Sequence, residues 1–117
     1  MNKICTSIEQ SEKLMKFLPS ESADMHYWKL DWNTYRLSVG HSKEWQEGYE
    51  IKKMVYIPCW SLTALLSVLP EGTRLLKSST GDTYHCDCPK GNIDKWHDNP
   101  VDACVEMVCK LHERKLI

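Results

Sequence analysis

The sequence has no surplus of charge of either sign. Its 117 residues include 15 Lys and Arg and 16 Asp and Glu, which gives a formal net charge of −1. A protein that neutralises the phosphates of nucleic acid normally carries a basic surplus. The basic side chains of residues 110–115 cluster at the end of a predicted helix, where cations complement the helix dipole. We therefore do not expect nucleic acid to be the partner.

Long hydrophobic runs are also missing. No apolar stretch approaches the length of about 20 residues that a membrane-spanning helix needs. Residues 1–5 lack the apolar core of a signal peptide. We therefore expect no contact with a membrane and a location in the cytoplasm. The six cysteines are then expected to be reduced thiols, since disulfides are rare in that compartment.

Glycine is scarce and scattered. The five glycines stand singly, each at a position that suits a turn, and they form no Gly-rich loop that could cradle a phosphate. No cofactor is expected. Phenylalanine occurs once, whereas tryptophan and tyrosine occur five times each. These amphipathic aromatics favour the edge of a core, with an N–H or O–H group that reaches outward.

Three helices are predicted from their termini and apolar faces. The first runs from about Ser7 to Phe17, after a capping box of Thr6 and Glu9, and ends before Pro19. Its apolar stripe consists of Ile8, Leu14, Met15 and Leu18. The second follows "PCWS" and carries an apolar face of Leu62, Leu65, Leu66 and Leu69.

The third helix has the clearest start. Asn99 is the predicted N-cap, Pro100 takes the first helical position, and Asp102 lies in the first turn. Its predicted buried stripe is Ala103, Cys104, Met107, Val108 and Leu111.

The extended segments form two predicted hairpins. The first pairs residues 25–30 with 34–39 around a turn at 31–33, and the second pairs residues 73–78 with 83–88 around a turn at 79–82. Residues 51–57 are expected to regain extended structure, and residues 89–97 are expected to form a loop. The fold class is therefore α+β: a single domain over residues 1–117, with an antiparallel sheet of about four strands and three helices in the order α-ββ-α-ββ-α.

The stretch "YHCDC" at residues 84–88 raises the question of a metal site. Structural zinc pairs usually have two to four residues between ligands, whereas Cys86 and Cys88 have one. On a strand the two cysteines face one way, and His85 and Asp87 face the other. A zinc site would need Cys86 and Cys88 with distant ligands such as His97, Cys59 or Cys104. A strand with buried cysteines is the favoured interpretation.

Two other groups of residues are candidate sites. His97 beside Asp98 could act as a general base held by a carboxylate, in a pocket with His85. The entry of the following helix explains Asp98 more simply. Glu106 precedes Lys110 by four residues, which predicts an ion pair on a solvated helix face rather than a catalytic carboxylate.

The polar segment 41–50 contains Trp45 and Tyr49, which have no apolar stretch to join. We interpret these two side chains as part of an interaction surface, either with another protein or with a second copy of the chain.

Two segments carry a resemblance to known proteins: "YIPCWSLTALLSVLP" and "DNPVDACVEMVCKLHERKLI". They resemble small uncharacterised proteins from phages, prophages and other mobile elements of gut Bacteroidales. The resemblance covers the C-terminal half well and the N-terminal half loosely. More distantly, the chain is similar to the phage α-β-α sandwich domains. The resemblance implies a mobile-element origin and an accessory role, and it supplies no catalytic residue.

The leading hypothesis is thus a non-enzymatic accessory or interaction protein of a phage-like element, which binds a protein partner or itself as a homodimer. The second is a small zinc-binding module that uses Cys86 and Cys88. The third is a small enzyme with a pocket near His85, His97 and Asp98.

Overall fold

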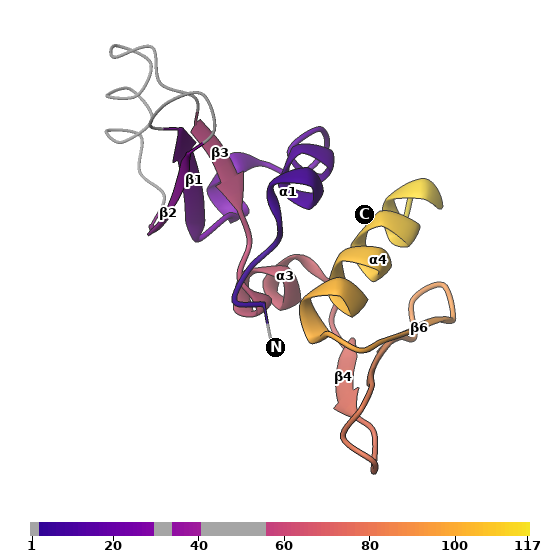
Figure 1. Cartoon of the computed structure of the whole chain (residues 1–117). Coiled ribbons are helices and arrows are strands. Elements are labelled where there is room, and N and C mark those ends of the chain that lie inside the picture. The colour runs from indigo at the N-terminus through magenta and orange to yellow at the C-terminus, as the bar shows by residue number, and fades with distance from the viewer. Residues whose placement is uncertain (1–2, 30–33, 41–55) are drawn as a thin grey trace. The chain divides into compact units, whose positions relative to one another are not determined.

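A computed structural model describes residues 3–29, 34–40 and 56–117 (Figure 1). The chain divides into two compact units. The N-terminal unit is Cys5–Ser61, and the C-terminal unit is Leu62–Ile117 together with Met1–Ile4. The prediction of one domain over residues 1–117 stays a prediction.

The N-terminal unit holds a short helix and a three-stranded antiparallel sheet. The strands lie in the order β2-β1-β3, so β1 is central. The helix α1 packs against β3 (Figure 1). The elements of this unit are α1 (Ile8–Leu14), the 3-10 helix η1 (Ser20–Ser22), β1 (Met25–Lys29), β2 (Tyr35–Val39) and β3 (Tyr56–Cys59).

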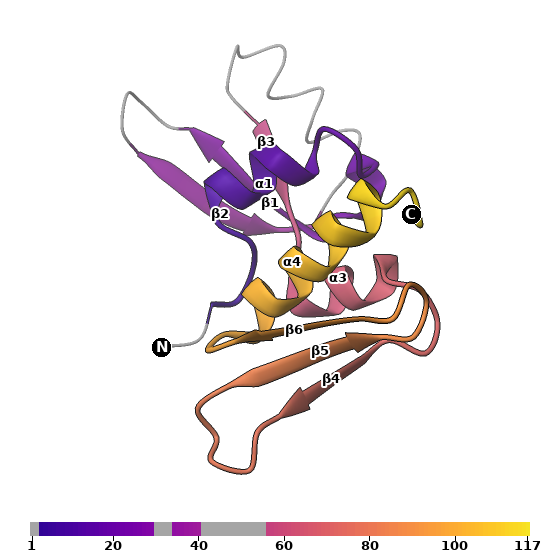
Figure 2. The ribbon, with the colours of Figure 1, turned by 90° about the vertical axis from the view of Figure 1, so that its right-hand side faces the viewer.

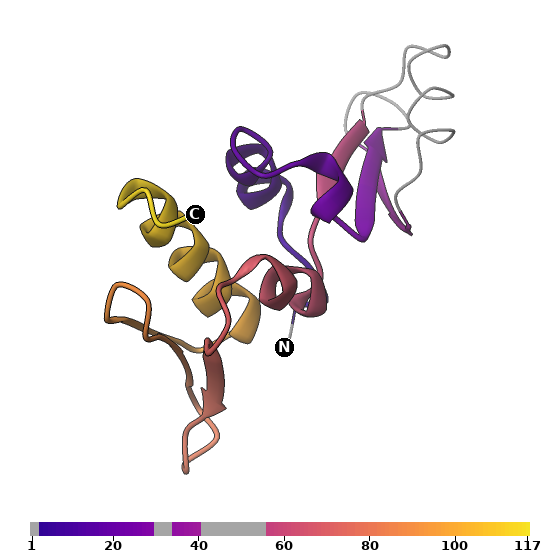
Figure 3. The ribbon, with the colours of Figure 1, turned by 180° about the vertical axis from the view of Figure 1, so that it is seen from behind.

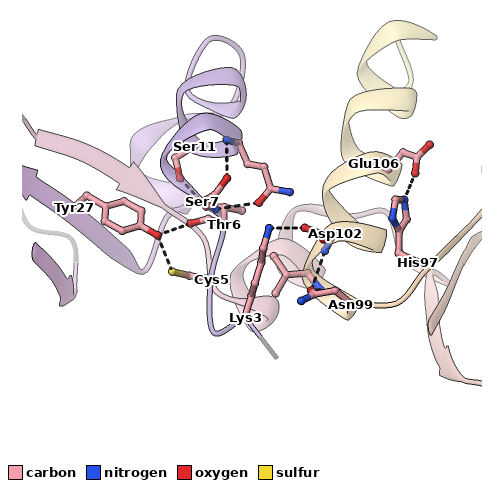
Figure 4. A network of polar contacts seen from close by, with 12 residues as sticks. Lys3, Cys5, Thr6, Ser7, Ser11, Tyr27, His97, Asn99, Asp102 and Glu106 are labelled. Atoms are coloured by element: carbon pink, nitrogen blue, oxygen red, sulfur yellow. Dashed lines mark hydrogen bonds and ion pairs between the residues drawn. The ribbon is translucent and has the colours of Figure 1, made fainter. Parts of the chain in front are cut away.

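The capping box of α1 lies one residue later than predicted. Ser7 is the N-cap: its hydroxyl accepts from the backbone N–H of Gln10 at 3.1 Å, and the Gln10 side chain accepts from the N–H of Ser7 at 3.0 Å (Figure 4). The prediction of Thr6 and Glu9 was wrong, because Thr6 is buried and accepts a hydrogen bond from the backbone N–H of Trp60 at 3.0 Å. A glutamine reaches back to the cap as well as a glutamate does.

The buried face of α1 also differs from the predicted stripe. Leu14 is fully buried, as predicted, but Met15 is 45% exposed. Successive helical residues point about 100° apart, so the turn that buries Leu14 directs Met15 to solvent. Ser11, three residues before Leu14, takes the buried place instead.

The C-terminal unit holds a second three-stranded antiparallel sheet, in the order β4-β5-β6. The long helix α4 packs against β5 and β6 along one face of this sheet (Figure 2). The helix α3 packs against α4 (Figure 3). The elements of this unit are α3 (Leu62–Val68), β4 (Arg74–Lys77), β5 (Tyr84–Cys88), β6 (Ile93–His97) and α4 (Pro100–Glu113).

The α+β class and both hairpins are confirmed, but the sheet prediction was wrong in number and order. The described residues form six strands in two sheets rather than about four strands. The strand β3 (Tyr56–Cys59) overlaps the end of the segment expected at 51–57, and residues 51–55 lie outside the described residues. The strand β6 lies where the sequence predicted a loop. No helix in the described ranges is long and apolar enough to cross a membrane.

The loop prediction failed at β6 because its inward positions are not all apolar. Ile93 is buried, but Lys95 and His97 follow it on the same face and are only half-buried. A lysine can bury its carbon stem against a helix while its ammonium group stays near solvent. The alternation of inward and outward residues is therefore present in β6, but a charged lysine and a histidine at inward positions make it hard to recognise in the sequence.

The start of α4 is confirmed. Oδ1 of Asn99 accepts from the backbone N–H groups of Val101 at 2.8 Å and Asp102 at 3.3 Å (Figure 4). Pro100 takes the first helical position, and Lys3 forms an ion pair with Asp102 at 2.8 Å. All members of the predicted stripe are buried: Ala103, Cys104, Met107, Val108 and Leu111.

The cap of α4 gives a test of this start. Replacement of Asn99 by Ala should lower the free energy of unfolding by about 1–2 kcal/mol, because two backbone N–H groups lose their buried acceptor. Asn99→Ser keeps an acceptor and should cost only a fraction of that amount. Urea denaturation of the three proteins measures the difference, and equal losses for Ala and Ser would contradict the capping role.

Candidate functional site

The side chains of β5 alternate between the two faces of its sheet. Cys86 and Cys88 are fully buried, with 0% exposure, on the face that α4 covers. His85 and Asp87 lie on the other face, where their side chains are 19% and 24% exposed. The prediction that both cysteines of "YHCDC" face the core is confirmed.

Buried thiols interact with each other in both units: Cys86 with Cys104, and Cys59 with Cys5. The thiol of Cys86 on β5 interacts electrostatically with the thiol of Cys104 on α4. This interaction raises the pKa of the Cys86 thiol, and burial raises it further. The same interaction lowers the pKa of Cys104, which burial opposes. In the N-terminal unit, burial and the nearby Cys5 raise the pKa of Cys59. A nucleophilic cysteine needs a thiolate and access to its substrate. Cys59, Cys86 and Cys104 are all 0% exposed and so lack that access, and the raised pKa of Cys59 and Cys86 also disfavours their thiolates.

The zinc alternative gains no support from the geometry. Among the residues that the structure describes, no group of three or more His, Cys, Asp or Glu side chains is placed to hold a metal ion. Cys88 donates to the carbonyl oxygen of Lys90 at 3.3 Å, and His97 is bound by a glutamate of α4. Zinc binding through Cys86 and Cys88 stays a prediction without a ligand set.

The accessibility of the thiols tests whether the cysteines are packed in the core and bind no metal. The six cysteines are free and buried, so a thiol reagent should modify the native protein far more slowly than the denatured protein, which should titrate as six thiols. Zinc is measured in the same sample, purified without added metal. Rapid native modification, or one bound zinc per chain, would contradict the packing role of these thiols.

His97 belongs to an ion-pair cluster between β6 and α4. Its Nε2 is hydrogen-bonded to the carboxylate of Glu106 (Figure 4). Nζ of Lys95 lies 3.4 Å from the same carboxylate. The predicted pair of Glu106 with Lys110 was wrong, since Lys110 pairs with Glu113 at 3.3 Å. The hydrogen bond from His97 and the charges of His97 and Lys95 lower the pKa of Glu106.

The predicted enzyme pocket is not formed. In the register of β5 and β6, His85 is opposite Trp96 and His97 is opposite Tyr84. His85 and His97 therefore lie on opposite faces of the sheet, because neighbouring positions of a strand alternate. Asp98 is exposed and lies beyond the end of β6. The three side chains cannot gather around one substrate.

The glutamate of this cluster predicts a pH dependence. Glu106 stays ionised to lower pH in the folded protein than in the unfolded chain, so its ion pair stabilises the fold at neutral pH. That contribution should fade as the pH falls below the ordinary carboxyl value of 4.5. Because the glutamate is partly exposed, Glu106→Gln should cost only about 0.5–1 kcal/mol at neutral pH, and less in acid.

Urea denaturation from neutral pH to about pH 3 measures this difference. Glu113→Gln, at the exposed end of α4, is the matched control and should show a smaller change. A cost of Glu106→Gln that is constant across this range would contradict the role of the ion pair.

The outer face of the β4-β5-β6 sheet, opposite α4, carries a second arrangement that the sequence did not reveal. Residues that pair directly across antiparallel strands lie on the same face and next to each other. The register therefore forms two rows on this outer face. The apolar row is Leu76, His85 and Trp96, and the charged row is Arg74, Asp87 and Asp94.

The apolar row is held by an aromatic stack. The rings of His85 and Trp96 lie 4.2 Å apart, with an angle of 14° between their planes. Trp96 is nevertheless 58% exposed, and Leu76 on the opposite side of His85 is 48% exposed. Nε2 of His85 is buried beneath this surface and makes no hydrogen bond within the described part of the chain. The stack fixes a large apolar side chain in a position open to solvent.

The charged row carries one basic and two acidic side chains. Arg74 pairs with Asp87 at 2.5 Å. Asp94 lies directly opposite Asp87 on the next strand, with its side chain 64% exposed. Nε2 of His85 is 3.9 Å from Asp94, which is too long for a hydrogen bond. Like charges at directly paired positions destabilise a sheet. A cation near Asp94 would therefore reduce the repulsion between Asp94 and Asp87.

Sequence reasoning missed this surface because it treated residues 89–97 as a loop. Alternation of Asp94 and Trp96 with Ile93 and Lys95 was the available signal. The interaction residues that it did predict, Trp45 and Tyr49, lie outside the described residues.

A scan against protein-family models gave no match, and neither a curated protein nor a solved structure matches the chain. The resemblance to phage and mobile-element proteins therefore stays a prediction that depends on the two quoted segments alone.

Proposed function

We propose that this protein is a non-enzymatic interaction protein that binds another protein, or a second copy of itself, through the outer face of the β4-β5-β6 sheet. The supporting observation is the exposed apolar row beside a charged row. The thiols and His97, which were the candidates for chemistry, are occupied by packing and by an ion pair.

The composition of the outer face suits protein recognition. Tryptophan and arginine are enriched among the residues that contribute most to protein interfaces. Here Trp96 is held rigidly against His85, so little side-chain entropy is lost when it is covered. Arg74 and Asp94 remain available at the margins of the face, with side chains 64% exposed in both cases. An exposed apolar centre with charged groups beside it is typical of a docking surface.

The accessory role in a phage-like or mobile element is part of the same proposal, and it rests on the resemblance of the two segments. A cytoplasmic location rests on the cysteines. All six are free thiols, as expected for a chain in a reducing compartment.

Two variants with a matched control test the role of the outer face. Tagged wild-type protein is incubated with untagged chain and with a lysate of the native host, and the proteins that it retains are quantified. Trp96→Ser and Leu76→Ser should each reduce recovery of the retained protein about tenfold or more, because each removes an apolar contact at the centre of the face. Met15→Ser is the control, since Met15 is 45% exposed and Leu76 is 48% exposed, but Met15 lies in the other unit.

Circular dichroism melts should show that all three variants remain folded, because the replaced side chains are exposed. Equal recovery with Trp96→Ser and Met15→Ser would contradict the proposal, and so would a wild-type chain that retains neither itself nor another protein.

A further inference from the structure

The two rows of the outer face are complementary to themselves. We infer that the occupant of this face is a second copy of the chain, packed face to face about a two-fold axis that runs parallel to β5. This inference rests on the proposed function and names the partner. In a two-fold interface the same patch is used on both copies, so the patch must complement itself.

The strand order determines which residues meet. A two-fold axis along the central strand exchanges the two outer strands, so that β4 of one copy lies over β6 of the other. Positions along the strands are unchanged by this rotation. The charged row of one copy therefore meets the charged row of the other in reversed order, and the two apolar rows meet in the same way.

In the charged row, the rotation places Arg74 over Asp94 of the second copy, and this contact occurs twice. A guanidinium group has five N–H donors in a planar fork. The bond from Nη2 of Arg74 to Asp87 leaves further donors for a second carboxylate. Asp94, whose partner within its own copy is Nε2 of His85 at 3.9 Å, thereby gains an arginine. Asp87 lies near the axis, where each copy already neutralises it with its own Arg74.

In the apolar row, the same rotation places Trp96 over Leu76 of the second copy, again twice. These are the two most exposed side chains of the row, at 58% and 48%. The stacked ring of His85 lies between them and fills the centre of the row. The contact would cover four large apolar side chains that are open to solvent in the single chain.

The dimensions of packed sheets permit these contacts. Two sheets that pack face to face lie about 10 Å apart, a gap that an arginine and an aspartate fill when they extend toward each other. Packed sheets usually cross at about 30°, and neighbouring strands are about 4.8 Å apart. The ends of a three-residue row are then displaced by only about 2–3 Å, which the long side chain of arginine can span.

Reversal of the charge at Arg74 or at Asp94 tests this arrangement of the two copies. Sedimentation equilibrium should show a dimer for the wild-type chain. Arg74→Asp and Asp94→Arg should each raise the dimer dissociation constant about tenfold or more, because each variant places like charges opposite each other at both ends of the row.

An equimolar mixture of the two variants should dimerise again. In the mixed dimer, every arginine of one chain faces an aspartate of the other. The double variant Arg74→Asp/Asp94→Arg should also dimerise, since the exchange restores opposite charges. Effects that arise only within one chain, such as loss of the Arg74–Asp87 pair, cannot be rescued by mixing.

The outcomes separate this inference from the proposed function. A wild-type chain that remains monomeric up to roughly 1 mM, or a mixture that fails to restore the dimer, overturns the inference. If the monomeric chain still retains a different protein that Trp96→Ser abolishes, the outer face binds a foreign partner and the proposed function stands. If the retention of no protein depends on Trp96, both the inference and the proposed function are wrong.

Discussion

The register of the central strand β5 is the constraint on which the C-terminal unit depends. Its two inward cysteines are fully buried against α4, so the strand cannot shift by one residue without turning both of them to the other face. The same register fixes the positions of His85 and Asp87 on the outer face. Two small buried side chains thus determine what the unit presents on its other surface.

The outer face follows from this register together with that of the neighbouring strands. Because β5 pairs with both β4 and β6, each of its outward residues lies at the middle of a row of three. His85 supports Trp96 by stacking, and Asp87 holds Arg74 by an ion pair. The inward side of β6 uses its polar groups differently, since Lys95 and His97 both bind Glu106 of α4. Lys95 and His97 of the inner face are thus paired within the unit, while the outer face retains an exposed tryptophan, an exposed leucine and an exposed aspartate.

The sequence predicted those features that depend on neighbours along the chain. The start of α4 was predictable because Asn99 and Pro100 act on adjacent backbone groups. The alternation of β5 was predictable because it depends only on strand geometry. The strand β6 was not, since its inward lysine and histidine are tolerated only because α4 supplies a glutamate. The pairing of His97 with Glu106 depends on the packing of α4 against β6. The separation of His97 from His85 depends on the strand register. The local sequence pattern encodes neither. The outer rows were missed for the same reason.

The chemistry of the outer face also selects one of the two symmetric ways in which it could meet a copy of itself. A two-fold axis across the strands, instead of along them, would place β4 over β4 and β6 over β6, with the order along each strand reversed. The charged row of one copy would then lie over the apolar row of the other. Arg74 would face Leu76 and Asp94 would face Trp96, so charges would be covered by apolar groups without gaining a partner, which is costly. The axis along β5 instead matches charge with opposite charge and apolar with apolar at both ends of the face. The preference arises from the order of residues within the rows, because Arg74 lies on one outer strand and Asp94 lies on the other.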